Sequence, residues 1–308
     1  MRRRKKIKRN LEVVLTRGLM RFARGLPRAT GLRVFSAIGD AAGRVLREDR
    51  KRALDNLEIA FPGMSLPVRE ALARAMFKTL GRNVFEFLNL KGSSKERLAA
   101  LIERVEGLEH LSEAREAGQG MIAITGHIGC WELLAGYFAT RGFEFTVVGR
   151  ELWEPRLNQE LIRIRESVGL RTVDRDRGGR EMLRTLRAGG IVAVLIDQHT
   201  RVTGVYVPFF SRPAHTPIGI AKLALKTGAK IVPLAIYMNE PGKHVIRILP
   251  AIADPPESET LERRAEIITE QCSRAVEDLI RYDPKQWVWF HKRWRDQEEA
   301  DVSHAVVN

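Results

Sequence analysis

Cysteine is scarce in this chain, and uncharged apolar runs are short. The 308 residues include two cysteines, Cys130 and Cys272. Two thiols cannot build the disulfide framework of a small secreted domain, and they fit a reducing compartment. Nothing around either thiol singles it out as a nucleophile, so we expect both to be small buried residues. No stretch of 18 uncharged apolar residues occurs, and we therefore predict no transmembrane helix.

Other absences narrow the protein class further. The chain shows no internal repeat, and no low-complexity segment beyond a basic arm at its start. His199 invites a metal site, but no His, Asp and Glu cluster has the spacing of metal ligands, so we expect no metal and assign no cofactor. The apolar run after the basic arm is interrupted by Arg17, Arg21 and Arg24, which is unlike a signal peptide.

Positive charge is concentrated near the N-terminus. Residues 1–52 carry 17 Lys and Arg against four acidic residues, while the formal charge of the whole chain is +14, so the rest is nearly neutral. A basic arm suits nucleic acid, anionic lipid or an acidic protein, or is simply solvated. Because the body is not basic and no nucleic-acid motif is present, we expect no nucleic-acid partner, although a nucleic-acid-binding protein is the non-enzyme alternative.

The segment after the arm favours a lipid surface. Leu15, Leu19, Phe22 and Leu26 recur at helical spacing and are interleaved with arginines. A basic amphipathic helix of this kind suits the interface of an anionic membrane. We therefore predict a membrane-associating region over residues 1–48.

The rest of the chain predicts an α/β fold. Continuous apolar strands favour a largely parallel sheet covered on both faces, and a hairpin around residues 240–243 makes the sheet mixed. We expect this sheet to be flanked by helices and preceded by an N-terminal helical region. The main domain would span residues 49–298, helical to about residue 118, with a tail at 299–308. The expected strands are 121–125, 144–149, 171–173, 191–196, 204–208, 231–238 and 244–249, and the expected helices after residue 90 are 95–105, 108–117, 130–140, 155–168, 178–188, 216–227 and 259–281.

The segment GHIGCWE, residues 126–132, is the most informative motif. It follows an apolar strand and precedes an apolar helix, so His127 lies at a strand-to-helix turn with Glu132 five residues on. A carboxylate in the first turns of that helix can reach back to the imidazole, fix its tautomer and make the other ring nitrogen more basic. This pattern also arises by chance in helices, but catalytic groups of α/β proteins lie at such strand ends. His127 is therefore a candidate general base.

At this point the sequence resembles a known family. His-x4-Asp/Glu after a buried strand is the signature of the glycerolipid acyltransferase superfamily. The fuller form is similar to the HxGNWE motif of the Kdo-dependent lauroyl and myristoyl acyltransferases of lipid A biosynthesis, with Cys130 where Asn is usual. Further matches follow in the family's order between about residue 10 and residue 295: Val148-Gly149-Arg150, Arg163 and Arg165, Ile196-Asp197-Gln198, residues 207–214, Ile231-Val232-Pro233 and residues 287–294.

Polar residues beyond the dyad are candidates for substrate binding. Asp197 follows a strand directly, as His127 does, so both side chains should open into one cleft, where Asp197 could bind an arginine, a sugar hydroxyl or a cation, or only shape a turn. Gln198 extends the polar pair. Thr216 precedes Pro217 and has the pattern of a helix N-cap. The free N–H groups in the first turn of that helix could face a phosphate.

Arginines supply the expected anion-binding groups, because their forked guanidinium suits phosphate and carboxylate. The resemblance points to Arg150, Arg163, Arg165 and Arg212, with a solvated surface charge as the alternative for each. The aromatic and basic segment at residues 287–294 suits either a membrane interface or core packing.

The resemblance implies an acyltransferase. A fatty acyl chain would pass from acyl carrier protein to a hydroxyl of a phosphorylated glycolipid, a lipid A precursor, at the cytoplasmic face of the cell inner membrane. His127, supported by Glu132, would deprotonate that hydroxyl. Other lipid acceptors remain open, among them a phosphoinositide mannoside, a lysophospholipid or an aminolipid, as does thioester hydrolysis.

Overall fold

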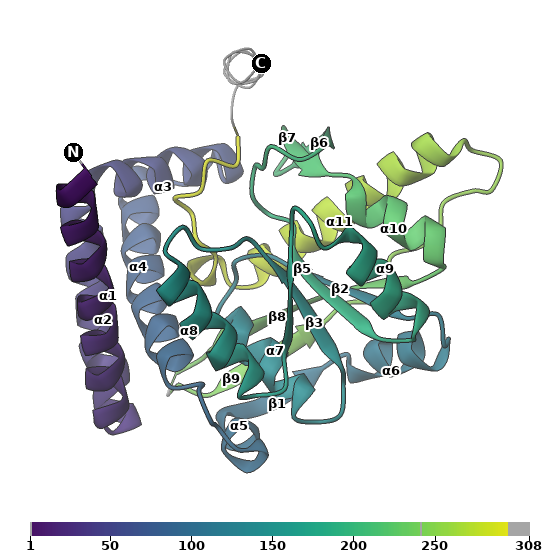
Figure 1. Ribbon diagram of the computed structural model, residues 1–308. Helices are drawn as coiled ribbons and strands as arrows, with labels where there is room; N and C mark the ends of the chain where they lie inside the picture. Colours follow the sequence, from purple (N-terminus) through teal and green to yellow (C-terminus); the bar gives the residue numbers. More distant parts are fainter. Residues whose placement is uncertain (1, 241, 295–308) are drawn as a thin grey trace.

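Four long helices open the chain. The computed structural model describes residues 2–240 and 242–294, with side chains described from residue 9 onward, so the predicted tail at 299–308 lies outside the described residues. In Figure 1 these helices form one end of the molecule, with α1 and α2 furthest from the sheet. The four are α1 (Arg2–Gly25), α2 (Arg28–Val45), α3 (Arg47–Ala60) and α4 (Leu66–Leu88).

Local sequence explains where α4 begins and how closely α2 and α4 pack. Helix α4 begins after Ser65 with a proline in its first turn, a position that proline favours. Helices α2 and α4 cross where Gly39 meets Gly81. A Cβ atom on Gly39 would lie 2.1 Å from the Phe77 carbonyl oxygen, and one on Gly81 would lie 2.0 Å from that of Phe35. The two glycines therefore allow the backbones to touch.

A seven-stranded sheet forms the centre of the protein, in the order β1-β9-β8-β2-β5-β3-β4. Strands β8, β2, β5, β3 and β4 run parallel, while β9 is antiparallel to β8 and parallel to β1. The mixed, largely parallel α/β fold is thus confirmed. The strands are β1 (Ile102–Glu106), β2 (Met121–Thr125), β3 (Phe145–Gly149), β4 (Arg171–Asp174), β5 (Ile191–Leu195), β8 (Lys230–Met238) and β9 (His244–Ile248).

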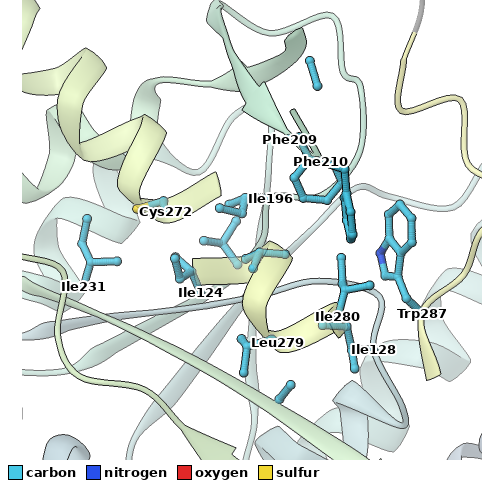
Figure 2. Close-up of a cluster of buried hydrophobic side chains, with 14 of the residues drawn as sticks. Ile124, Ile128, Ile196, Phe209, Phe210, Ile231, Cys272, Leu279, Ile280 and Trp287 are labelled. Atoms are coloured by element: carbon cyan, nitrogen blue, oxygen red, sulfur yellow. The ribbon is translucent and has the colours of Figure 1, made fainter. Parts of the chain in front are cut away.

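Helices cover both faces of the sheet, and side chains along β2 alternate between two hydrophobic cores. Ile122 and Ile124 point into the core built with α3, α10 and α11, whereas Met121 and Ala123 point into the core built with α7 and α8. Figure 2 shows part of the first core, where Ile124 and Ile128 lie near Leu279 and Ile280 of α11. The covering helices are α5 (Lys95–Leu101), α6 (Leu108–Glu116), α7 (Trp131–Ala139), α8 (Pro155–Glu166), α9 (Gly179–Arg187), α10 (Gly219–Thr227) and α11 (Leu261–Tyr282).

Three predicted elements are corrected. The helix expected at 95–105 ends at Leu101, and the chain continues as the edge strand β1 because Ile102–Glu106 pairs with β9. The strand expected at 204–208 is β6 (Gly204–Phe209), which leaves the main sheet and pairs only with β7 (Arg212–Pro217), a strand not predicted. The helix expected from residue 216 begins at Gly219, since Thr216 and Pro217 belong to β7.

Candidate active site

His127 lies in a tight turn at the carboxyl end of β2. The turn needs its glycines: Gly129 has φ +59°, and a Cβ atom there would lie 1.9 Å from the carbonyl oxygen of Ile236. The C-terminal segment secures the same turn, because Gly129 N–H donates to the Gln286 carbonyl at 3.0 Å and Val288 N–H donates to the His127 carbonyl at 3.3 Å. The backbone of the imidazole-bearing residue is thus fixed from two sides.

Asp197, not Glu132, is the carboxylate that orients the imidazole. Its Oδ1 lies 2.8 Å from His127 Nδ1, and its Oδ2 accepts the main-chain N–H of His127 at 2.7 Å. This is possible because β2 and β5 are neighbouring parallel strands, so the residues that follow them meet at one edge. A shared cleft for His127 and Asp197 was predicted from the sequence, but their direct bond was not.

Asp197 is a buried anion that keeps its charge. It is 1% exposed, and Trp287 Nε1–H donates to its Oδ2 at 2.6 Å. Burial alone would raise its pKa, but the charge and hydrogen bonds of His127, with a contribution from His291, outweigh burial and hold the pKa below its usual range. An ionised Asp197 accepts the Nδ1 proton of His127, which leaves Nε2 as the basic nitrogen.

Glu132 bonds elsewhere, which corrects the expectation that it reaches back to His127. The two oxygens of Glu132 accept from Arg165 Nε at 3.0 Å and Nη2 at 2.6 Å. Both side chains are at most 10% exposed. Helix α7 directs Glu132 toward α8, and Gly149 leaves room for the guanidinium, since a Cβ atom there would lie 3.2 Å from Arg165 Nη1. Glu132 therefore fixes Arg165 beside the site.

His127 lies in the wall of a large cleft. Its volume is about 710 Å³, and His127, Trp131, Gln198 and Arg165 line it beside the carboxyl ends of β3 and β5. Most of the remaining wall is apolar and comes from β5, α9 and α10. These apolar residues include Val148, Met182, Val194, Ile196, Ile218, Ile220 and Leu223.

Cations line the cleft as well. Arg150 and Lys222 are exposed and come from the end of β3 and from α10, and Arg175 lies nearby with its Nε donating to Asp176 at 2.8 Å. Arg150 was predicted from the sequence, whereas Arg175 and Lys222 were missed because neither belongs to a recognisable motif. An apolar cleft with cations in its wall suits an amphiphile that carries an anionic group.

Four predicted binding residues do not line the cleft, and Asp197 is one of them, because its carboxylate is buried against His127. The side chain of Arg163 is 59% exposed and lies 3.6 Å from Glu160. Arg212 is exposed on the β6–β7 hairpin. Thr216 is 1% exposed and caps no helix, because its hydroxyl accepts from the buried Arg293 at 2.8 Å.

The aromatic C-terminal segment belongs to the site rather than to a surface. Trp287 and Trp289 are fully buried, so the expected membrane interface is wrong for them. Figure 2 shows Trp287 beside Phe209, Phe210 and Ile128. From α3, Asn56 Nδ2–H donates to the Trp289 carbonyl at 2.6 Å and thereby ties the segment to the N-terminal helices.

The same segment brings a second imidazole to the site. The ring of His291 lies 4.8 Å from that of His127, centroid to centroid. Burial, with a smaller effect of His127, lowers the pKa of His291 to about 4, so this ring is neutral at pH 7. His291 was not predicted as a site residue, because the tryptophans and basic residues around it dominate the composition of the segment.

The thiols and the possible metal ligands play no visible part here. Cys130 and Cys272 are both 3% exposed, as expected, and burial raises the pKa of each thiol, for Cys272 to about 12. A thiolate nucleophile is therefore disfavoured. Within the described part of the chain, no group of three or more His, Cys, Asp and Glu side chains is arranged to hold a metal ion.

Fold and site together indicate the class of protein: an α/β enzyme with an oriented imidazole beside an apolar cleft that has cations in its wall. Over residues 1–296 the sequence matches the bacterial lipid A biosynthesis acyltransferase family, and the chain belongs to that family. This confirms the resemblance noted from GHIGCWE. The family is one of enzymes that transfer acyl groups.

Individual relatives fall into two groups by name. Phosphatidylinositol mannoside acyltransferase of Mycobacterium tuberculosis (strain ATCC 25618 / H37Rv) is 29% identical over 90% of this chain and 83% of its own length. Lipid A biosynthesis lauroyltransferase of Escherichia coli (strain K12) is 26% identical over 89% and 88%. Lipid A biosynthesis myristoyltransferase of the same strain is 25% identical over 87% and 82%. Identity at this level does not separate the two acceptors.

Proposed function

We propose that this protein transfers a fatty acyl chain from acyl carrier protein to a hydroxyl of a phosphorylated glycolipid, a lipid A precursor, at the cytoplasmic face of the inner membrane. The observation that carries the proposal is the His127–Asp197 pair, with Nε2 of the imidazole beside an apolar cleft in whose wall cations lie. The acyl chain would lie along the apolar wall. Phosphate groups of the substrates would meet Arg150 and Lys222.

The residues support a direct transfer. Nε2 of His127 takes the proton of the acceptor hydroxyl while the hydroxyl oxygen bonds to the thioester carbon. The tetrahedral intermediate then collapses, the carbon–sulfur bond breaks, and the His127 imidazolium returns the proton to the leaving thiolate. Asp197 stabilises that imidazolium through Nδ1. A thioester is already activated, so a general base and an oxyanion site suffice, and no acyl-enzyme is required.

Glu132 has an indirect role in this mechanism. It holds the guanidinium of Arg165 in the cleft wall through two hydrogen bonds. Glu132 is therefore a positioning residue, and His127 is the catalytic base.

Helix α1 supports attachment to a membrane surface. Val13, Met20 and Ala23 face the body of the protein and are buried. The opposite face is apolar and exposed, and an exposed apolar face beside arginines suits an anionic lipid interface. This exposed face, the α1 apolar face, consists of Leu11, Val14, Leu15, Leu19 and Phe22. No helix in the described ranges is long and apolar enough to cross a membrane.

A phosphatidylinositol mannoside is the second candidate acceptor, because relatives named for acylating it match the chain as well as the lipid A enzymes do. The test is to incubate the purified protein with acyl-loaded acyl carrier protein and each acceptor separately, and to measure product by mass spectrometry. An acylated lipid A precursor supports the proposal. Acylation of the mannoside alone would mean that the second acceptor is the substrate. Release of free fatty acid without an acylated lipid would indicate a hydrolase.

A further inference from the structure

We propose that Gln198 is the oxyanion donor of this site and that His291 positions its amide. The inference rests on the proposed acyl transfer and adds the group that would stabilise the tetrahedral intermediate. Its basis is the position of the Gln198 side chain, which lines the cleft between the two imidazoles.

The amide nitrogen of Gln198 bridges the two rings. It lies 3.2 Å from Nε2 and 3.4 Å from Nδ1 of His127. It also lies 2.9 Å from Nδ1 and 3.1 Å from Nε2 of His291. Being nearly equidistant from both nitrogens of each ring, the amide is not aligned on the Nε2 lone pair, which stays open to the acceptor hydroxyl.

The protonation states decide which end of the amide faces the rings. Nδ1 of His127 donates to Asp197, so Nε2 of the neutral ring carries a lone pair. Burial keeps the pKa of His291 low, at about 4, so that ring also presents a lone pair. Two acceptors call for the amide NH₂ group rather than the amide oxygen. One N–H donates to His291, behind the cleft wall, and the other faces the reacting groups.

Three main-chain N–H groups near His127, and the guanidinium of Arg165, already have acceptors. The main-chain N–H of His127 bonds to Asp197 at 2.7 Å, that of Ile128 to the Gly126 carbonyl at 2.7 Å, and that of Gly129 to Gln286 at 3.0 Å. Arg165 is engaged by Glu132. The Gln198 amide has a second N–H, besides the one directed to His291, that can donate to a substrate oxygen.

This donor lies where negative charge develops. Nε2 of His127 takes the hydroxyl proton as the hydroxyl oxygen bonds to the thioester carbon. In the same step negative charge develops on the carbonyl oxygen of the thioester, which is bonded to the carbon under attack. An acceptor hydroxyl within hydrogen-bond reach of Nε2 places that oxygen next to the Gln198 amide, because the amide lies 3.2 Å from Nε2.

Gln198→Leu in the purified full-length protein tests the donor. Loss of one oxyanion donor should lower kcat by about 10²- to 10³-fold and leave KM within about threefold of the wild-type value. Gln119→Leu is the matched control, since Gln119 is exposed and precedes the opposite end of β2. A kcat within about threefold of wild type in Gln198→Leu, or a loss confined to KM, would overturn the proposal.

His291→Phe tests the positioning role. It should lower kcat about tenfold by releasing the amide, and the double variant with Gln198→Leu should be no slower than Gln198→Leu alone. Independent structural damage would instead add the two losses, and additivity would overturn the role of His291.

The same comparison separates this inference from the proposed function. Attack by water on the thioester develops the same oxyanion, so hydrolysis of an acyl thioester without acceptor provides a second assay. If the wild-type protein hydrolyses the thioester but acylates no lipid, the proposed function fails. A normal hydrolysis rate in Gln198→Leu would then sink the inference, and a loss of about 10²-fold would support it.

Discussion

Asp197 holds His127 by both its ring and its backbone, with Oδ1 2.8 Å from Nδ1 and Oδ2 accepting the main-chain N–H at 2.7 Å. One carboxylate thus sets the tautomer of the imidazole and the position of the turn that carries it. Trp287 donates to the same Oδ2, so the far C-terminal segment also fixes this carboxylate. These contacts bring together His127 and residues about 70 and 160 positions further along the chain.

Asp197→Asn should therefore impair catalysis severely. The substitution keeps the shape of the side chain but removes the charge that stabilises the imidazolium and selects the Nδ1–H tautomer. We expect kcat to fall by about 10²- to 10⁴-fold with the fold intact, measured at saturating donor and acceptor. Wild-type kcat in a folded Asp197→Asn protein would mean that another group orients His127.

Glu132→Gln should affect stability first. Breaking the buried pair leaves Arg165 without its carboxylate, which costs on the order of 3 kcal/mol in the free energy of unfolding. Adding Arg165→Met should restore part of that stability, because no unpaired charge then remains. Urea unfolding of the single and double variants measures both effects.

A pH profile separates this pair from the dyad. Since Glu132 contacts Arg165 and not His127, the pH dependence of kcat/KM in Glu132→Gln should keep the wild-type inflection of the general base. A shifted inflection would show that Glu132 does act on His127 directly.

The neutral His291 makes the fold sensitive to acid. Its pKa is about 4 in the folded protein, against 6.5 for an ordinary histidine. Between these values the unfolded chain binds a proton that the folded protein does not, so the free energy of unfolding falls as pH drops from 6.5 to 4 and this effect saturates below 4. At pH 5 the loss is about 2 kcal/mol.

His291→Asn isolates this effect. The variant lacks the titrating group, so its free energy of unfolding should fall less than that of the wild type between pH 7.5 and pH 5. Equal losses in the two proteins would mean that His291 is not held neutral by the fold.

The α1 apolar face should bind anionic vesicles. Leu11→Ser with Leu15→Ser removes two exposed apolar side chains from it, 56% and 61% exposed, and should weaken binding to vesicles of phosphatidylcholine and phosphatidylglycerol about tenfold or more. Val68→Ser with Leu261→Ser is the matched control, because these residues are 52% and 64% exposed on other helices. Equal binding by both double variants would assign attachment elsewhere.

Much of the fold follows from sequence patterns, and the exceptions have physical causes. Continuous apolar runs marked β2, β5 and β8 because both faces of these strands are buried. Strand β1 was not predicted because Ile102–Glu106 has a composition similar to that of α5. Its extended conformation comes from pairing with β9. Strand β7 was missed because it contains Pro213 and Pro217 and pairs only with β6, away from the main sheet.

The site was predictable in its residues but less so in its bonds. The strand-end positions of His127 and Asp197 indicated that the two side chains meet, although only His127 lines the cleft. The partner of His127 did not follow from spacing, because Glu132 is nearest in sequence and only the packing of α8 against α7 gives it Arg165. His291 lies in a matched motif, yet its neighbour in space is some 160 residues away in sequence, which no local pattern reveals.

Transfer by the His127→Ala variant tests the central claim most directly. Purified wild-type and variant protein are first shown by circular dichroism to be equally folded. Each is then incubated with acyl-loaded acyl carrier protein and a lipid A precursor, and mass spectrometry follows the amount of acylated lipid over time. The account predicts that the wild type adds one acyl chain and that the variant is slower by about two to four decades, the usual contribution of a general base. Near-normal acylation by folded His127→Ala protein would contradict it.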